Sequence, residues 1–339
     1  MSGREPLAAI FGLAGSALSV SERAFFRDAD PVGFILFARN CEEPGQVRRL
    51  VASLRDCLGR ADAPVLIDQE GGRVARLKPP HFHVYPAAGA IAARGGARAR
   101  EAARLGARLI ADDLAALGIS VDCMPVLDLP AEGADPVIGD RAYGDSPETV
   151  AALGRAACDG LLAGGVLPVL KHIPGHGRAA VDSHYALPRV DAPLSALEAS
   201  DFAPFRALAA MPWAMTAHIL YGAIDQDAPA TLSPRLIREV IRASIGFDGV
   251  LLSDDVSMAA LPGGIGERAA RALAAGCDIT LHCNGDAAEM RDVAGRAAPL
   301  TAAATRRLAG GEALRRARIE PFDRRAAELR FAALMGGEG

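Results

Sequence analysis

The sequence predicts an α/β protein: a single-domain (β/α)8 TIM barrel with C-terminal helices packed outside. Eight short apolar runs alternate with Ala-, Arg- and Leu-rich segments of helical spacing, which is typical of a parallel sheet covered by helices. The length of 339 residues fits one such barrel with insertions. Polar side chains also recur at the carboxyl ends of the apolar runs, where barrels build their sites.

The eight expected strands are apolar throughout, as strands buried on both faces are. They comprise residues 8–15, 32–38, 64–69, 119–129, 166–173, 213–220, 249–254 and 277–283. The alternative is a doubly wound open sheet with a glycine-rich phosphate turn after the first strand. The segment GLAGSA at that place has the wrong spacing for such a turn.

The segments between the strands carry helix signals. Residues 97–118 have helical spacing, and Ser146-Pro147 and Ser233-Pro234 each supply a serine cap with proline in the first turn. We expect long loops at residues 81–96 and 130–145. The whole chain, 1–339, then forms one domain, with the barrel at about residues 7–285 and a helical segment at about 286–339.

Composition excludes several classes of partner. The net charge of −4 is spread along the chain without a basic block, so we expect no nucleic-acid partner and no membrane partner. The six cysteines form no CxxC pair, which indicates a reduced, cytoplasmic protein. The first 20 residues do not form a convincing signal peptide, because Glu5 and two glycines interrupt it. We also expect a monomer.

The segment KHIPGHGRAAVDSH, residues 171–184, holds three histidines, a lysine and an aspartate. A zinc site, a phosphate cradle, a proton-transfer site and a plain loop are the alternatives for it. His172 and His176 would share one face of a helix, but the Pro-Gly pair between them disfavours a helix and so a zinc site. For His176, a structural role and a contact with ligand both stay open. Asp182 and His184 lie two apart, and in an extended loop the carboxylate would orient the imidazole for proton transfer.

Asp254 ends the apolar run at 249–254, where an unused carboxylate would be costly. With an acid on one loop and a carboxylate on a strand end, the pair is suited to cleaving a glycosidic bond. Polar residues at the other strand ends would then bind sugar hydroxyls, namely Asp68, Arg76, Arg141, Lys171 and His172. Alternatively, Lys171 is a Schiff-base lysine such as barrel aldolases use.

Several long motifs together resemble a known family. KHIPGHGRAAVDSH, DQEGGRVARL and GVLLSDDVSMAAL, with GFILFARN, GDRAYGD and MTAHILY, are similar to the single-domain bacterial β-N-acetylglucosaminidases of glycoside hydrolase family 3. The resemblance extends from about residue 30 to 285. Ile173 departs from it, because the family usually has phenylalanine there.

The resemblance implies a retaining exo-glycosidase with a covalent glycosyl–enzyme intermediate. It assigns the nucleophile to Asp254 and the acid/base to His184, assisted by Asp182. It also assigns sugar binding to the five polar residues given above, and it implies neither a cofactor nor a metal. The implied substrate is a muropeptide in which N-acetylglucosamine is β-1,4-linked to anhydro-muramic acid, cleaved in the cytoplasm during peptidoglycan recycling.

Three other functions stay open at this point. A metal-dependent barrel hydrolase would use His172, His176 and His218, and a binding module would hold sugar without cleaving it. A phosphorylase is the third, because a neutral histidine would not repel phosphate attacking the intermediate.

Overall fold

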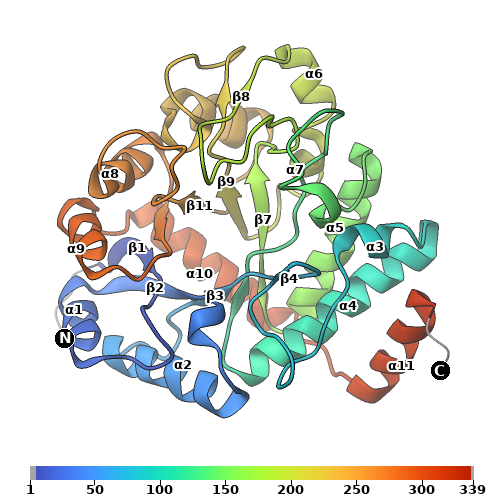
Figure 1. Ribbon diagram of the computed structural model, residues 1–339, viewed down its shortest axis with the longest axis horizontal. Coiled ribbons are helices and arrows are strands. Elements are labelled where there is room, and N and C mark those ends of the chain that lie inside the picture. Colours follow the sequence, from blue (N-terminus) through green and yellow to red (C-terminus); the bar gives the residue numbers. More distant parts are fainter. Residues whose placement is uncertain (1–4, 337–339) are drawn as a thin grey trace.

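The computed structural model describes residues 5–336 and shows a closed eight-stranded parallel barrel (Figure 1). The expectations for residues 1–4 and 337–339 lie outside the described residues. The strand order around the barrel is β1-β12-β11-β9-β7-β6-β3-β2, and every neighbouring pair is parallel. The predicted (β/α)8 fold is therefore confirmed.

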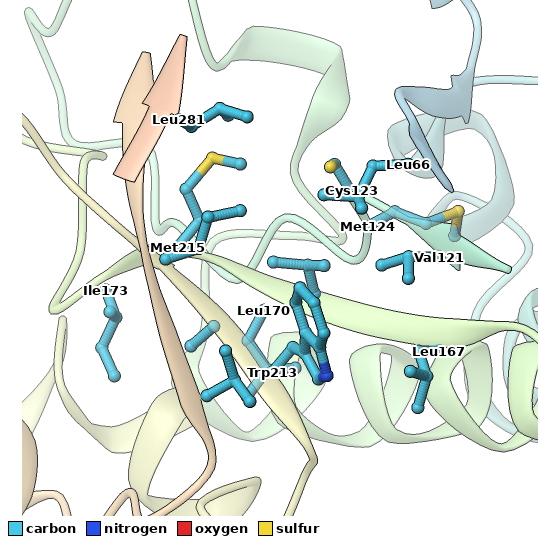
Figure 2. Close-up of a cluster of buried hydrophobic side chains, with 14 of the residues drawn as sticks. Leu66, Val121, Cys123, Met124, Leu167, Leu170, Ile173, Trp213, Met215 and Leu281 are labelled. Atoms are coloured by element: carbon cyan, nitrogen blue, oxygen red, sulfur yellow. The ribbon is translucent and has the colours of Figure 1, made fainter. Parts of the chain in front are cut away.

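Each of the eight predicted apolar runs overlaps one barrel strand. The strands are β1 (Leu7–Phe11), β2 (Pro31–Leu36), β3 (Val65–Ile67), β6 (Val121–Asp122), β7 (Leu167–Ile173), β9 (Trp213–Thr216), β11 (Val250–Asp255) and β12 (Ile279–His282). Their side chains fill the barrel interior: Figure 2 shows Leu66, Val121, Leu170, Trp213 and Leu281, from five different strands, in one buried cluster.

Helices cover the outside of the barrel. They are α1 (Val20–Ala29), α2 (Pro44–Leu58), α3 (Ala88–Ala92), α4 (Gly96–Ala116), α5 (Pro147–Ala163), α6 (Leu194–Ala199), α7 (Ala203–Ala207), a π-helix (Leu236–Ser244), α8 (Ile265–Ala275), α9 (Ala287–Arg296), α10 (Ala302–Ala317) and α11 (Arg324–Met335). Within residues 5–336, none of these helices has the length and apolar character needed to span a bilayer.

The two predicted helix starts carry the expected caps. The Ser146 hydroxyl accepts a hydrogen bond from the Thr149 N–H at 3.2 Å, and the Ser233 hydroxyl accepts one from the Leu236 N–H at 3.0 Å. One expected loop is partly wrong, because α3 interrupts residues 81–96. This stretch is rich in alanine, and Ala88 and Ile91 are buried, so a short helix gains packing that the sequence pattern alone did not reveal.

The last helices take two different positions. α10 lies under the amino-terminal ends of the strands, where its residues share a cavity with Val32, Pro64, Leu167 and Trp213. α11 packs beside α4 on the outside, and Arg98 of α4 donates a hydrogen bond to the Leu334 carbonyl at 2.7 Å (Figure 1). With α10 at one end of the barrel, the opposite end, formed by the carboxyl ends of the strands, is left for a site.

Candidate active site

A cavity of about 380 Å³ opens at the carboxyl ends of the strands. All eight predicted site residues line it: Asp68, Arg76, Arg141, Lys171, His172, Asp182, His184 and Asp254. They lie on segments that follow β3, β6 and β7, on β7 itself and at the end of β11. The barrel therefore collects residues that are up to 186 positions apart in the sequence, and this size of cavity suits a small ligand.

One wall of the cavity is a row of alternating charges centred on Lys171. The Lys171 ammonium contacts Asp68 at 2.8 Å and Glu70 at 2.6 Å. Arg76 donates to Asp68 at 2.9 Å, and Arg141 donates to both carboxylate oxygens of Glu70 at 2.8 Å. Three cations and two carboxylates thus fix one another and present a rigid set of donors and acceptors.

The charges in this row are retained despite burial. Burial by itself raises the pKa of Asp68 and of Glu70, but Lys171 and the neighbouring arginines outweigh it and hold both pKa values below their ordinary values. Burial would also lower the pKa of Lys171, but Asp68 and Glu70 raise it above its ordinary value. A lysine held in its protonated form is a poor nucleophile, so the geometry disfavours the Schiff-base alternative.

The segment after β3 owes its shape to two glycines and a glutamine. Gly71 and Gly72 adopt φ of 92° and 58°, and a Cβ on Gly71 would lie 2.4 Å from the Pro86 carbonyl oxygen. The Gln69 side-chain oxygen accepts hydrogen bonds from the N–H groups of Arg76 and Leu77 at 2.9 and 3.0 Å. This hairpin of β4 (Gln69–Gly71) and β5 (Val74–Ala75) returns Arg76 to the side of Asp68.

Asp128 fixes two of the histidines that line the cavity. One of its oxygens accepts from the His172 ring nitrogen Nδ1 at 2.7 Å, and the other accepts from the N–H groups of His172 and His176 at 3.1 and 2.6 Å. Burial would raise the pKa of Asp128, but these histidines lower it to about 2. Because a carboxylate only accepts, Nδ1 of His172 is the donor, and its Nε2 is left for the ligand.

His176 is buried, and its Nε2 lies 3.1 Å from the Ser183 hydroxyl. Burial and the neighbouring His172 lower the pKa of His176 to about 4, so the ring is neutral near pH 7. It links the core of the barrel to the loop that carries Asp182 and His184.

Asp182 and His184 form the predicted pair, although by a different backbone geometry. Nδ1 of His184 donates to the Asp182 carboxylate at 2.7 Å, and the His184 N–H donates to the same oxygen at 2.9 Å. The extended loop that we expected is wrong, because the Tyr185 N–H donates to the Asp182 carbonyl at 3.0 Å and closes a tight turn. The turn brings the side chains together just as extended backbone would have, and among residues 5–336 no group hydrogen-bonds to Nε2 of His184.

Asp254 and its neighbour Asp255 have different surroundings. Asp255 accepts from the hydroxyl and the N–H of Ser257 at 2.6 and 3.0 Å, so it braces the turn after β11. For Asp254 the structure gives only the N–H of Asp255, at 2.8 Å, as a hydrogen-bond donor. Burial raises the pKa of Asp254, but the nearby His218 and His172 outweigh it and hold the pKa below its ordinary value. Asp254 is therefore an ionised carboxylate with an oxygen available to a ligand.

The structure adds residues that the sequence did not mark as part of the site. Glu70, Tyr185 and Asp255 line the cavity, and Asp128 supports it through His172. Glu70 had a detectable signal, since it follows Asp68 by two residues and alternate residues of a strand share a face. Asp128 also lies near the end of an apolar run, but nothing in the sequence indicated that it binds His172 and His176.

Within residues 5–336, no group of three or more His, Cys, Asp or Glu side chains is arranged to hold a metal ion. The histidines of the metal alternative are engaged elsewhere. His172 donates to Asp128, and His218 contacts the Thr231 hydroxyl at 2.7 Å and the Asp255 carbonyl at 2.9 Å.

Several known proteins are similar to this chain in sequence. Residues 16–307 match the glycosyl hydrolase family 3 N-terminal domain. A β-hexosaminidase of Alkalilimnicola ehrlichii is 43% identical over 282 residues, covering 81% of this chain and 80% of that protein. A β-hexosaminidase of Pseudomonas aeruginosa is 40% identical over 275 residues, which cover 80% of this chain and 81% of that protein.

A solved structure also has the same fold. It is that of NagZ from Neisseria gonorrhoeae in complex with N-trifluoroacetyl-D-glucosamine, with a TM-score of 0.87 and 33% identity. The alignment covers 99% of this chain and 100% of that one.

Proposed function

This chain belongs to glycosyl hydrolase family 3, and from that premise we propose that Asp254 and His184 make it a retaining exo-β-N-acetylglucosaminidase. The chain is a glycoside hydrolase that acts on N-acetylhexosaminides, as its β-hexosaminidase relatives are named. One observation carries the assignment of residues. An ionised, available carboxylate and a carboxylate-bound histidine with a free ring nitrogen line the same cavity.

In the first step, an Asp254 oxygen bonds to the anomeric carbon while the bond to the leaving oxygen breaks. Nε2 of protonated His184 gives its proton to that oxygen, and Asp182 stabilises the charged ring through Nδ1. In the second step, neutral His184 takes a proton from water as the water oxygen bonds to the anomeric carbon and displaces Asp254. Both residues return to their starting states.

The charged wall supports recognition of the sugar. Asp68, Arg76, Arg141, Lys171 and His172 supply donors and acceptors fixed by their own ion pairs, which is suited to several hydroxyl groups on one ring. The cavity volume of about 380 Å³ favours a single terminal sugar and hence exo action.

For the biological role, we propose muropeptides that carry N-acetylglucosamine β-1,4-linked to anhydro-muramic acid, processed during peptidoglycan recycling. The likeness to the β-hexosaminidases and to NagZ supports this role. We place the reaction in the cytoplasm because all six cysteines are unpaired thiols, as a reducing compartment requires. We also propose that the enzyme is a monomer and needs no cofactor.

The test is release of nitrophenol from the 4-nitrophenyl β-glycosides of N-acetylglucosamine and of glucose, with and without EDTA. We expect activity on the first, little on the second, and no effect of the chelator. Asp254→Ala should abolish turnover. His184→Ala should lose much more activity on an oligosaccharide than on the nitrophenyl glycoside, because nitrophenolate leaves with little help from an acid.

Two results would contradict the proposal. Loss of activity with EDTA would favour the metal-dependent barrel hydrolase instead. Equal loss on both kinds of substrate in His184→Ala would show that His184 is not the proton donor.

A further inference from the structure

Tyr185 differs from every other large aromatic side chain in the described part of the chain. Tyr185 is 83% exposed, whereas Tyr85, Tyr143 and Tyr221 are at most 7% exposed. Each Phe and Trp is buried or half-buried. Tyr185 nevertheless lines the mouth of the catalytic cavity. A large ring exposed to water at a ligand site, rather than packed in the core, indicates a contact with the ligand.

The backbone ties this ring to the proposed acid. Tyr185 follows His184 directly, and its N–H closes the turn on the Asp182 carbonyl at 3.0 Å. To donate its proton, His184 must lie about 3 Å from the glycosidic oxygen. That oxygen belongs to the leaving group, so the first ring of the leaving group lies within reach of the Tyr185 side chain.

The two sides of the cavity also differ in chemistry. The donor sugar faces the buried charges around Lys171. Tyr185, from the loop after β7, lines the same cavity but is exposed to water. A sugar ring has an apolar face of C–H groups, and this face suits an aromatic ring better than a charged wall does.

We infer that Tyr185 is a specificity-determining residue that stacks on the ring of the leaving group and so selects substrates with a sugar or aryl aglycone. This inference rests on the proposed function. The contact exists only until the leaving group departs. Tyr185 therefore accelerates formation of the glycosyl–enzyme and has no part in its hydrolysis.

The test compares two substrates that share the donor sugar. N,N′-diacetylchitobiose has a sugar ring as its leaving group, whereas β-N-acetylglucosaminyl fluoride has a single atom. Tyr185→Ala should lower kcat/KM for the disaccharide about fivefold, because one aromatic contact is worth about 1 kcal/mol. The value for the fluoride should not change. Tyr185→Phe keeps the ring and should resemble the wild type on both substrates.

Val84→Ala is the matched control, because Val84 is 74% exposed but does not line the cavity. It should leave both substrates unaffected. An equal loss on the two substrates in Tyr185→Ala would overturn the inference, since the ring would then only hold His184 in place. No loss on the disaccharide would overturn it as well. A wild-type protein inactive on both substrates would overturn the proposed function and this inference with it.

Discussion

At the scale of single residues, the two lysines of the chain have opposite environments. Lys78 is exposed, whereas the side chain of Lys171 is only 3% exposed and lies between Asp68 and Glu70. A buried charge is tolerated only when it is paired, and removal of one partner leaves the others uncompensated. Lys171 therefore stabilises the fold as well as shaping the sugar-binding wall.

We expect Lys171→Ala to lower the free energy of unfolding by about 3–5 kcal/mol, because Asp68 and Glu70 would face each other without the ammonium between them. Denaturation by urea measures this change. Lys78→Ala is the matched control and should change stability by less than about 0.5 kcal/mol. If both variants were equally stable, the buried ion pairs would have no net effect on folding.

The chemical types of the site residues were predictable from sequence, and so was the pair of Asp182 and His184, but the other partners were not. Aspartates, a lysine and histidines at the ends of apolar runs pointed to one face of a barrel. That Lys171 binds Glu70 as well as Asp68 depends on the distance between the loop after β3 and strand β7. Sequence spacing carries no information on that distance.

At the scale of elements, the loop at residues 174–184 is positioned by a close backbone contact. A Cβ on Gly177 would lie 1.8 Å from the Leu129 carbonyl oxygen, in the loop after β6. The Ala131 N–H also donates to the Gly177 carbonyl at 2.9 Å. Gly177 thus has a packing reason to be glycine.

Gly177→Ala should separate the two loops and displace His184 from the sugar. A displacement of about 1 Å can cost about 100-fold in rate, so we expect a loss of that order in kcat/KM. The thermal midpoint should fall as well, because Gly177 is buried and alanine there would force two packed backbones apart. Steady-state kinetics and a melting curve on the same preparation measure both effects.

Gly295→Ala provides the control for this change. Gly295 lies in α9 with no atom near its Cβ position, so alanine there should preserve activity and slightly increase stability. Full activity in Gly177→Ala would show that the contact with Leu129 does not position the catalytic loop.

At the scale of the whole molecule, α10 closes the amino-terminal end of the barrel. Arg307 of α10 contacts Asp278 at 2.9 Å and Asp248 at 2.7 Å, and Gly311 of the same helix lies against the indole of Trp213. Without α10, the floor of the barrel core at Trp213 would be open to water. We therefore propose that the barrel and the helices after it form one folding unit.

Truncation after Leu300 should abolish cooperative unfolding, because it removes α10 and exposes the floor of the core. Circular dichroism during thermal unfolding is the measurement. Truncation after Arg318 is the control, since it keeps α10, removes α11 and the segment before it from the outer surface, and should leave a folded, less stable protein. If the chain truncated after Leu300 unfolded cooperatively at the wild-type temperature, the barrel would fold without α10.

The sequence by itself determined the eight strands, the capped helices and the chemical types gathered at one end of the barrel. These features follow from local patterns, namely continuous apolar runs, serine caps and polar residues at strand ends. Only the tertiary structure decided which charges pair, that α3 forms within an expected loop, and that a turn joins Asp182 to His184. It also decided that Tyr185 stays exposed at the mouth of the cavity. Each of these depends on which loops lie side by side, and that is set by closure of the barrel rather than by neighbours in the chain.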